Sequence, residues 1–237
     1  MIAERYRRLV LGLVCLLTVG ATSACTQTPA RSVGPKPTTA PIVAAFQAKV
    51  GVKDFQFEAS MTGSVHLESG GRTVDGTLSG GGKYAGGNSS SSMRMDAPTL
   101  GKSTVQDDVL WGRYEYSRAD RGPWGKKVMA DGYLGTWGAL FAPKRQFAYV
   151  GQETKGGKKL HRLDLIDDEA FAKESSSEPG PGNAAVTIWV QDDGTPQFLH
   201  MDQSGTVPVS GTAVNAVMVM DFTFVKFSGI SISPPNV

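Results

Sequence analysis

The chain has 237 residues, 40% of them hydrophobic, and its 24 lysine and arginine residues nearly balance its 22 aspartate and glutamate residues. This balance argues against nucleic acid or another strongly charged partner. The 29 glycines and 13 prolines favour a turn-rich, mainly β domain, and one domain of normal size accounts for the length.

The first 24 residues have the order of a secretory signal. Three arginines within the first eight residues precede an apolar run over 9–19, and small residues then lead to Cys25. The run is shorter than the roughly 20 residues that a membrane-spanning helix needs. Removal of 1–24 would take away three arginines and one glutamate, which leaves 21 basic and 21 acidic residues.

The residues Thr22-Ser23-Ala24-Cys25 resemble the lipobox of bacterial lipoproteins, in which the cysteine becomes the first mature residue and carries diacylglycerol. Thr22 departs from the family, which prefers leucine there. Ordinary signal cleavage after Ala24 is the alternative, because small residues also precede such sites. Acylation of Cys25 would anchor an exported protein to the outer face of the plasma membrane, since each buried methylene contributes about 0.8 kcal/mol. No internal disulfide is then possible, because the other cysteine, Cys15, lies in the signal.

Residues 25–41 are rich in Thr, Ser, Gly, Lys and Pro, so we expect a flexible tether before a folded domain over 42–237. Apolar residues at helical spacing predict a short helix over 42–50. Apolar and polar residues then alternate over 55–68, which predicts one long half-buried strand or two strands bent at Gly63.

The glycine-rich stretch 80–87 is expected to be a strongly curving strand that follows the hairpin partner 72–79. It is not a phosphate-binding loop, because Lys83 is followed by Tyr84 where that motif has serine or threonine. A polar loop is expected through Ser92.

The rest of the chain reads as hairpins, with a helical stretch from Asp131 to Phe141. A short helix is expected over 167–174 and a flexible loop over 175–182. The expected strands are 93–95, 103–106, 109–116, 126–128, 147–153, 158–165, 185–191, 197–203 and 212–227. This order predicts a mainly β (α+β) fold, with a curved antiparallel sheet of about 8–11 strands wrapped around a few short helices.

No residue pattern supports catalysis. The three histidines, His66, His161 and His200, lack metal-ligand spacing, and no nucleophile motif is present. The acidic clusters at 167–169 and 192–193 are explained by a helix start and a hairpin turn. We therefore expect no enzyme activity, metal or cofactor.

Large apolar residues are the feature left over, and they could line a hydrophobic cavity. The candidates are Phe55, Phe57, Met61, Trp111, Trp137, Phe141, Trp189, Met218, Met220, Phe222 and Phe224. The alternative is that they simply fill the core, which is the more frequent role of such residues.

The segments Cys25, 109–114, 122–124, 186–194 and 220–235, together with the helix through Leu140, resemble the LppX/LprG-type lipoproteins of actinobacterial envelopes. That family shares a fold with the lipoprotein carriers LolA and LolB. The resemblance implies a curved sheet around helices and a hydrophobic cavity for acyl chains of lipids or lipoglycans.

The same resemblance implies a monomeric lipid-transfer protein with an envelope transporter or acceptor protein as partner. The short first helix and the Gly/Ser-rich stretch 80–92 depart from the family and bear on the size of the cavity. Two other classes stay open. One is a non-catalytic envelope scaffold or signalling regulator without lipid cargo, and the other is a hydrolase or binding protein for small polar ligands.

Overall fold

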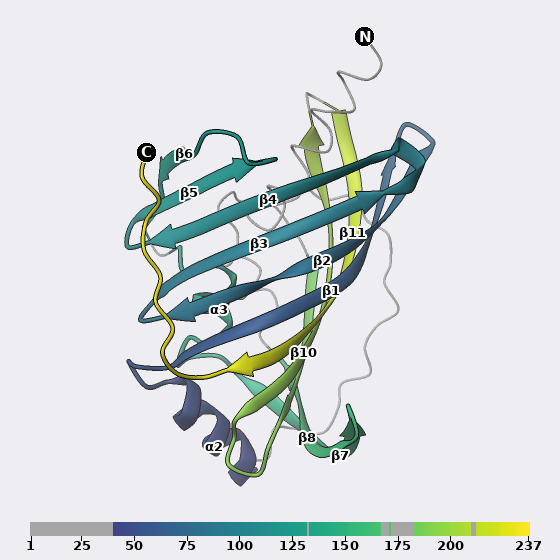
Figure 1. Ribbon diagram of the computed structural model, residues 1–237. Coiled ribbons are helices and arrows are strands. Elements are labelled where there is room, and N and C mark those ends of the chain that lie inside the picture. The colour runs from purple at the N-terminus through teal and green to yellow at the C-terminus, as the bar shows by residue number, and fades with distance from the viewer. Residues whose placement is uncertain (1–39, 132, 167–170, 172–182, 210–211) are drawn as a thin grey trace.

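An open, eleven-stranded antiparallel sheet dominates the computed structural model (Figure 1). The structure describes residues 40–131, 133–166, 171, 183–209 and 212–237. The strand order is β6-β5-β4-β3-β2-β1-β11-β10-β9-β8-β7. Two hairpin-connected meanders, β1 to β6 and β7 to β11, are therefore joined by the pairing of β1 with β11. The predicted fold class is confirmed.

The strand bounds follow the chain. The first meander contains β1 (Gln56–Ser69), β2 (Arg72–Ala85), β3 (Asn88–Ala97), β4 (Lys102–Trp111), β5 (Tyr114–Ala119) and β6 (Gly125–Val128), with a 3-10 turn, η2 (Pro98–Leu100), between β3 and β4. The second contains β7 (Phe147–Lys155), β8 (Lys158–Leu165), β9 (Asn183–Val190), β10 (Pro196–Val209) and β11 (Thr212–Lys226).

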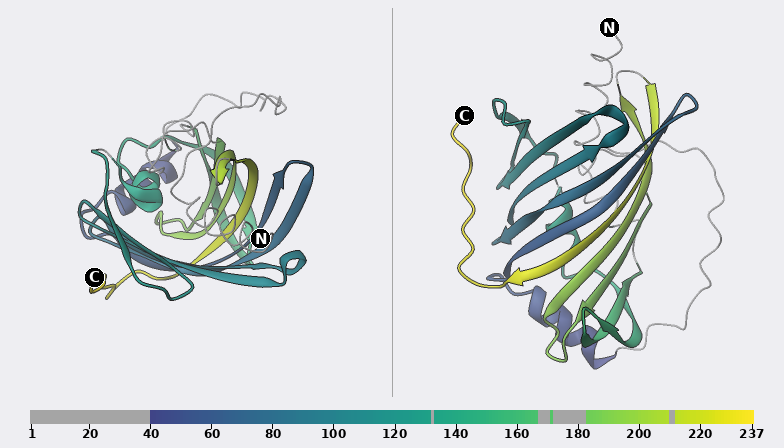
Figure 2. Two further views of the ribbon diagram at one scale, coloured as in Figure 1. Left: turned by 90° about the horizontal axis from the view of Figure 1, so that it is seen from above. Right: turned by 45° about the vertical axis from the view of Figure 1, so that its right-hand side comes forward.

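Two helices lie within the curve of the sheet (Figure 2). The first, α2 (Pro41–Val50), starts on a proline, whose fixed φ suits the first turn, and buries Ile42, Val43, Phe46 and Val50. It confirms the predicted helix. No helix among the described residues is long and apolar enough to cross a membrane.

The second helix, α3 (Gly135–Leu140), is shorter than the predicted stretch from Asp131 to Phe141. Gly135 has a φ of +66°, in the left-handed region, which prevents a right-handed helix from continuing through it. The helix therefore begins at this glycine, and its buried Trp137 and Leu140 face the sheet.

Two strand predictions are corrected by the structure. The expected polar loop over 88–92 is the first half of β3, because its backbone pairs with β2 on one side and with β4 on the other. The expected single strand 109–116 is two strands, because Gly112 adopts a φ of +59° and turns the chain after Trp111. Residues 167–170 and 172–182, with the predicted helix and loop, lie outside the described residues, apart from Phe171.

The core lies on the concave face of the sheet. In β1 the alternation is as predicted, because Phe57, Ala59, Met61, Val65 and Leu67 are buried while the residues between them face the convex side. The cross-strand register carries this alternation into every neighbouring strand. The concave face thus joins apolar positions from both meanders.

Gly63, in the middle of β1, allows the two meanders to approach closely. A side-chain carbon at this position would lie 2.2 Å from the carbonyl oxygen of Val219 in β11. We expect Gly63→Ala to lower the free energy of unfolding by about 1–3 kcal/mol, because the two strands must move apart. Urea unfolding measures this loss.

Gly125→Ala is the matched control, because a carbon there would lie 3.5 Å from the carbonyl oxygen of Ser117, an ordinary contact at the sheet edge. Equal stability of the Gly63 variant and the wild type would contradict the close approach of β1 and β11.

Candidate functional site

An aromatic cluster fills one part of the concave face. Phe57 is fully buried at its centre. Its ring centroid lies 5.6 Å from Tyr84, 4.9 Å from Trp137, 5.5 Å from Phe141 and 5.0 Å from Phe224. Edge-to-face and stacked rings at these distances stabilise one another beyond the burial of their area. Packed aromatic side chains therefore fill this part of the concave face.

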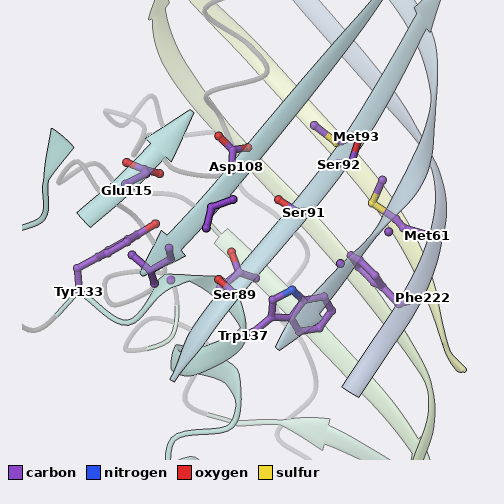
Figure 3. Close-up of a pocket in the computed structure, with 16 residues that line it drawn as sticks. Met61, Ser89, Ser91, Ser92, Met93, Asp108, Glu115, Tyr133, Trp137 and Phe222 are labelled. Atoms are coloured by element: carbon purple, nitrogen blue, oxygen red, sulfur yellow. The ribbon is translucent and has the colours of Figure 1, made fainter. Parts of the chain in front are cut away.

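A pocket lies beside this cluster, between α3 and strands β1 to β5 (Figure 3). Its apolar end is formed by Met61, Met93, Trp137 and Phe222. Room exists there because Gly82 has no side chain, and a carbon at that position would lie 3.1 Å from Trp137 Nε1. The apolar end of the pocket is thus lined by side chains that also belong to the core.

The other end of the pocket is polar. Figure 3 shows Ser89 and Ser91 of β3, Asp108 of β4, Glu115 of β5 and Tyr133, which precedes α3, around this end. Strand alternation explains the grouping, because Ser91 pairs with Asp108 across β3 and β4 and both side chains face the concave side. The pocket is therefore two-ended, with an apolar interior and hydroxyl and carboxyl groups opposite.

The cavity volume is about 80 Å³. An apolar cavity of roughly 150 Å³ accommodates a benzene molecule. The pocket as it stands can take a few waters or the end of a chain, but not a complete acyl chain.

Burial shifts the ionisation of the polar end. Loss of hydration, with a smaller contribution from the nearby charges of Glu115 and Asp107, raises the pKa of Asp108 to about 7. One hydrogen bond opposes this shift, since Gln106 Nε2 donates to Asp108 Oδ1 over 2.8 Å. Burial also raises the pKa of Glu115, and Lys127 partly offsets that rise.

Tyr133 belongs to the same electrostatic group. Burial, helped by the negative charges of Glu115 and Asp108, raises the pKa of its hydroxyl well above the usual range. The hydroxyl is therefore neutral at physiological pH and able to donate a hydrogen bond into the pocket.

The predicted cavity residues divide into three groups. Met61, Trp137 and Phe222 line the pocket. The others on the concave face fill the core, and these are Phe55, Phe57, Phe141, Met218, Met220 and Phe224.

Trp111 and Trp189 lie on the convex face, because their neighbours Leu110 and Ile188 take the concave positions. Trp189 Nε1 donates to Glu153 Oε1, and the Lys155 ammonium lies 4.5 Å from the centre of its ring. These two tryptophans therefore do not reach the pocket.

The sequence reasoning missed the polar half of the pocket. Ser91 lies on the same face of β3 as the buried Met93 and Met95, and Asp108 lies on the same face of β4 as Leu110. Recognition of β3 as a strand would have placed both polar residues on the buried face. Cys25, the other predicted site residue, lies outside the described residues.

The histidines lie apart on the surface, each beside an aspartate. His66 Nδ1 lies 2.7 Å from Asp75, and His200 Nδ1 lies 3.0 Å from Asp221. Within the described part of the chain, no three potential metal-ligating side chains converge.

An open hollow of about 540 Å³ lies on the convex face, behind the pocket. Two of its charged side chains already form an ion pair, since Arg118 Nε lies 2.8 Å from Asp107. Ser92 donates to the same carboxylate over 2.7 Å, and the Arg118 guanidinium lies 4.5 Å from the Trp124 ring. These contacts tie the wall of the hollow together as a surface network.

No protein-family model matches the sequence, and no curated protein matches it. Several solved structures are similar to it. LppX from Mycobacterium tuberculosis shares 8% identity, with 81% of this chain and 97% of that chain covered and a TM-score of 0.37. A LolA superfamily protein from Nitrosomonas europaea shares 12% identity, with 81% of this chain and 94% of that chain covered and a TM-score of 0.30. A DUF1329 family protein from Desulfovibrio piger shares 10% identity, with 77% of this chain and 91% of that chain covered and a TM-score of 0.35.

The raised pKa of Asp108 has a consequence for stability. The folded carboxyl titrates near pH 7 and an unfolded one near 3.9, so between these values the folded protein binds more protons. The contribution of Asp108 to the free energy of unfolding should therefore fall as the pH rises from about 4 to about 7.

Asp108→Asn should remove this dependence, so that its stability relative to the wild type increases between pH 5 and pH 8. Urea unfolding at both values measures the change. Glu68→Gln, at an exposed position on the convex side of β1, is the control and should keep the wild-type slope. Parallel wild-type and Asp108→Asn profiles would show that burial does not shift this carboxyl.

Proposed function

We propose that this protein is a membrane-tethered envelope lipoprotein that binds the apolar part of a lipid or other amphiphile between the sheet and α3. The two-ended pocket carries this proposal. Small-molecule sites are mostly apolar hollows with a few convergent polar groups, and the pocket has both parts. The family resemblance described from the sequence points to the same class of ligand.

Binding of an acyl chain requires the pocket to enlarge, and α3 is the wall best suited to move. It has six residues, no side-chain cap and a glycine at each of positions 135 and 138. Its Trp137 ring separates the cavity from the aromatic cluster around Phe57. Met61 and Met93 on the sheet side have flexible side chains that adapt to irregular guests.

The lipobox supplies the tether in this proposal. Residues 26–40 separate Cys25 from α2. A coil of this length spans about 20 Å on average, by the scaling for flexible chains. An acylated Cys25 would then keep the folded domain within reach of the membrane surface, where lipid ligands are found.

A second candidate function is a non-catalytic envelope scaffold or regulator without lipid cargo. The small cavity favours it, because the aromatic cluster already occupies much of the concave face. Binding of a simple amphiphile separates the two candidates.

Ser91→Leu should fill the pocket from the sheet side. Ser91 lines the pocket on the concave face of β3, so a leucine there would occupy the space of the ligand. We expect the variant to bind 1-octanol at least about tenfold more weakly than the wild type, a loss of about 1.4 kcal/mol. Ligand-observed NMR titration measures the affinity.

Ser90→Leu is the matched control, because the neighbouring side chain lies on the convex face of the same strand. Its affinity for 1-octanol should equal that of the wild type. Undetectable 1-octanol binding, together with native mass spectra free of co-purifying lipid, would exclude the carrier function and leave the scaffold.

Cys25→Ala should release the protein from membranes or block its processing, because the thioether anchor cannot form. The expected readouts are loss from the membrane fraction and absence of the acyl mass on the mature N-terminus. Circular dichroism of the domain from residue 42 onward should not change. A soluble wild-type protein with an unmodified Cys25 would refute the anchor and leave the pocket function standing.

A further inference from the structure

The polar end of the pocket is acidic. Its described lining contains two carboxyl groups, Asp108 and Glu115, and no lysine, arginine or histidine. Three hydroxyl groups, from Ser89, Ser91 and Tyr133, complete this end (Figure 3). The pocket therefore presents acceptors and neutral hydroxyls to whatever enters it.

The β4–β5 hairpin fixes the two carboxyl groups on the same face. Asp108 is the cross-strand partner of Ser117, and Glu115 is the partner of Leu110, so the two acids are diagonal neighbours. Diagonal neighbours on one face of an antiparallel pair lie about 7–8 Å apart, close enough for one ligand group to interact with both.

The charged groups on the surrounding elements place no cation among the residues that line the pocket. On β4 itself, Asp108 accepts one hydrogen bond from Gln106, while Asp107 faces the convex side and pairs with Arg118 of β5. On β6, Lys127 is the cross-strand partner of Glu115 and lies on the same face of the sheet, where its charge partly offsets the rise in the pKa of Glu115. Its side chain is exposed and is not among the residues that line the pocket.

Two further charged groups lie on the segments next to β4 and α3. Arg113, in the β4–β5 turn, faces Asp131 at 3.8 Å, and both side chains are exposed. The segment before α3 contributes Tyr133, whose hydroxyl is neutral at physiological pH. None of these groups places a positive charge inside the pocket.

We infer that the pocket selects amphiphiles with a cationic amine head, with the ammonium between Asp108 and Glu115 and the apolar chain directed toward Met61, Trp137 and Phe222. This inference rests on the proposed function. An ammonium has three donors and no acceptor, which matches the two carboxylates and the hydroxyl groups. A carboxylate or phosphate head would add a third negative charge in a poorly hydrated site, where repulsion is strong.

The selectivity should depend on pH. A primary alkylammonium resembles a lysine side chain, with a pKa of about 10.4, and so stays charged between pH 6 and pH 8. The Asp108 carboxyl, with a pKa of about 7, loses its proton in the same interval. Affinity for the amine should therefore rise with pH as the carboxylate forms.

Three probes with the same eight-carbon chain test the inference: octylammonium, octanoate and 1-octanol, titrated by calorimetry against the full-length mature protein. At pH 8 we expect octylammonium to bind at least about tenfold more tightly than octanoate, with 1-octanol between them. The ratio should fall at pH 6. Ser91→Leu should weaken the binding of all three at least about tenfold, which assigns the binding to the pocket.

Asp108→Asn and Glu115→Gln should each lower the ratio of octylammonium to octanoate affinity. Glu68→Gln changes the net charge equally outside the pocket and should leave the ratio unchanged. Similar affinities for the three probes would overturn the inference while the pocket function stands. Failure of 1-octanol to bind would instead overturn the proposed function and, with it, the inference.

Discussion

The pairing of β1 with β11 is the contact on which the rest of the structure depends. It joins strands from opposite ends of the folded domain and is the single link between the two meanders in the described sheet. Its register sets Met61 opposite Phe222 and Ala59 opposite Phe224. The apolar end of the pocket therefore exists only when the two meanders have met. Such non-local pairing is entropically costly to form.

Under the proposed function, the concave face serves two competing uses. Packing of Phe57 against five neighbouring rings stabilises the fold, whereas the proposed ligand would need the space beside Trp137. The short helix α3 lies where the packed aromatic cluster meets the pocket. Trp137 of α3 both packs against Phe57 in the core and lines the pocket. Any enlargement of the pocket at this helix therefore reduces the packing of the core.

Strand alternation made much of the fold predictable from the sequence, and the same rule explains the errors. In β1 one apolar residue at every second position fixes the buried face, and Phe57 and Met61 were placed correctly. In β3 the serines of residues 89–92 hide that alternation, so a strand resembled a loop. In β9, by contrast, nearly every position is apolar, so the sequence does not reveal which face of the sheet Trp189 occupies. The acids of the pocket depend on the register of β3, β4 and β5, which no local pattern reveals.

The sheet is open, and so it has two edges that a closed barrel would not have. Unpaired strand edges invite pairing with another chain. At one edge, β6 is four residues long and carries Lys126 and Lys127. At the other, β7 is interrupted by a register shift between Tyr149 and Gly151. Short length, lysines and a bulge all oppose strand addition. Under the proposed membrane tether, copies of the protein would meet at high local density, and these edges would keep neighbouring molecules from joining into a continuous sheet.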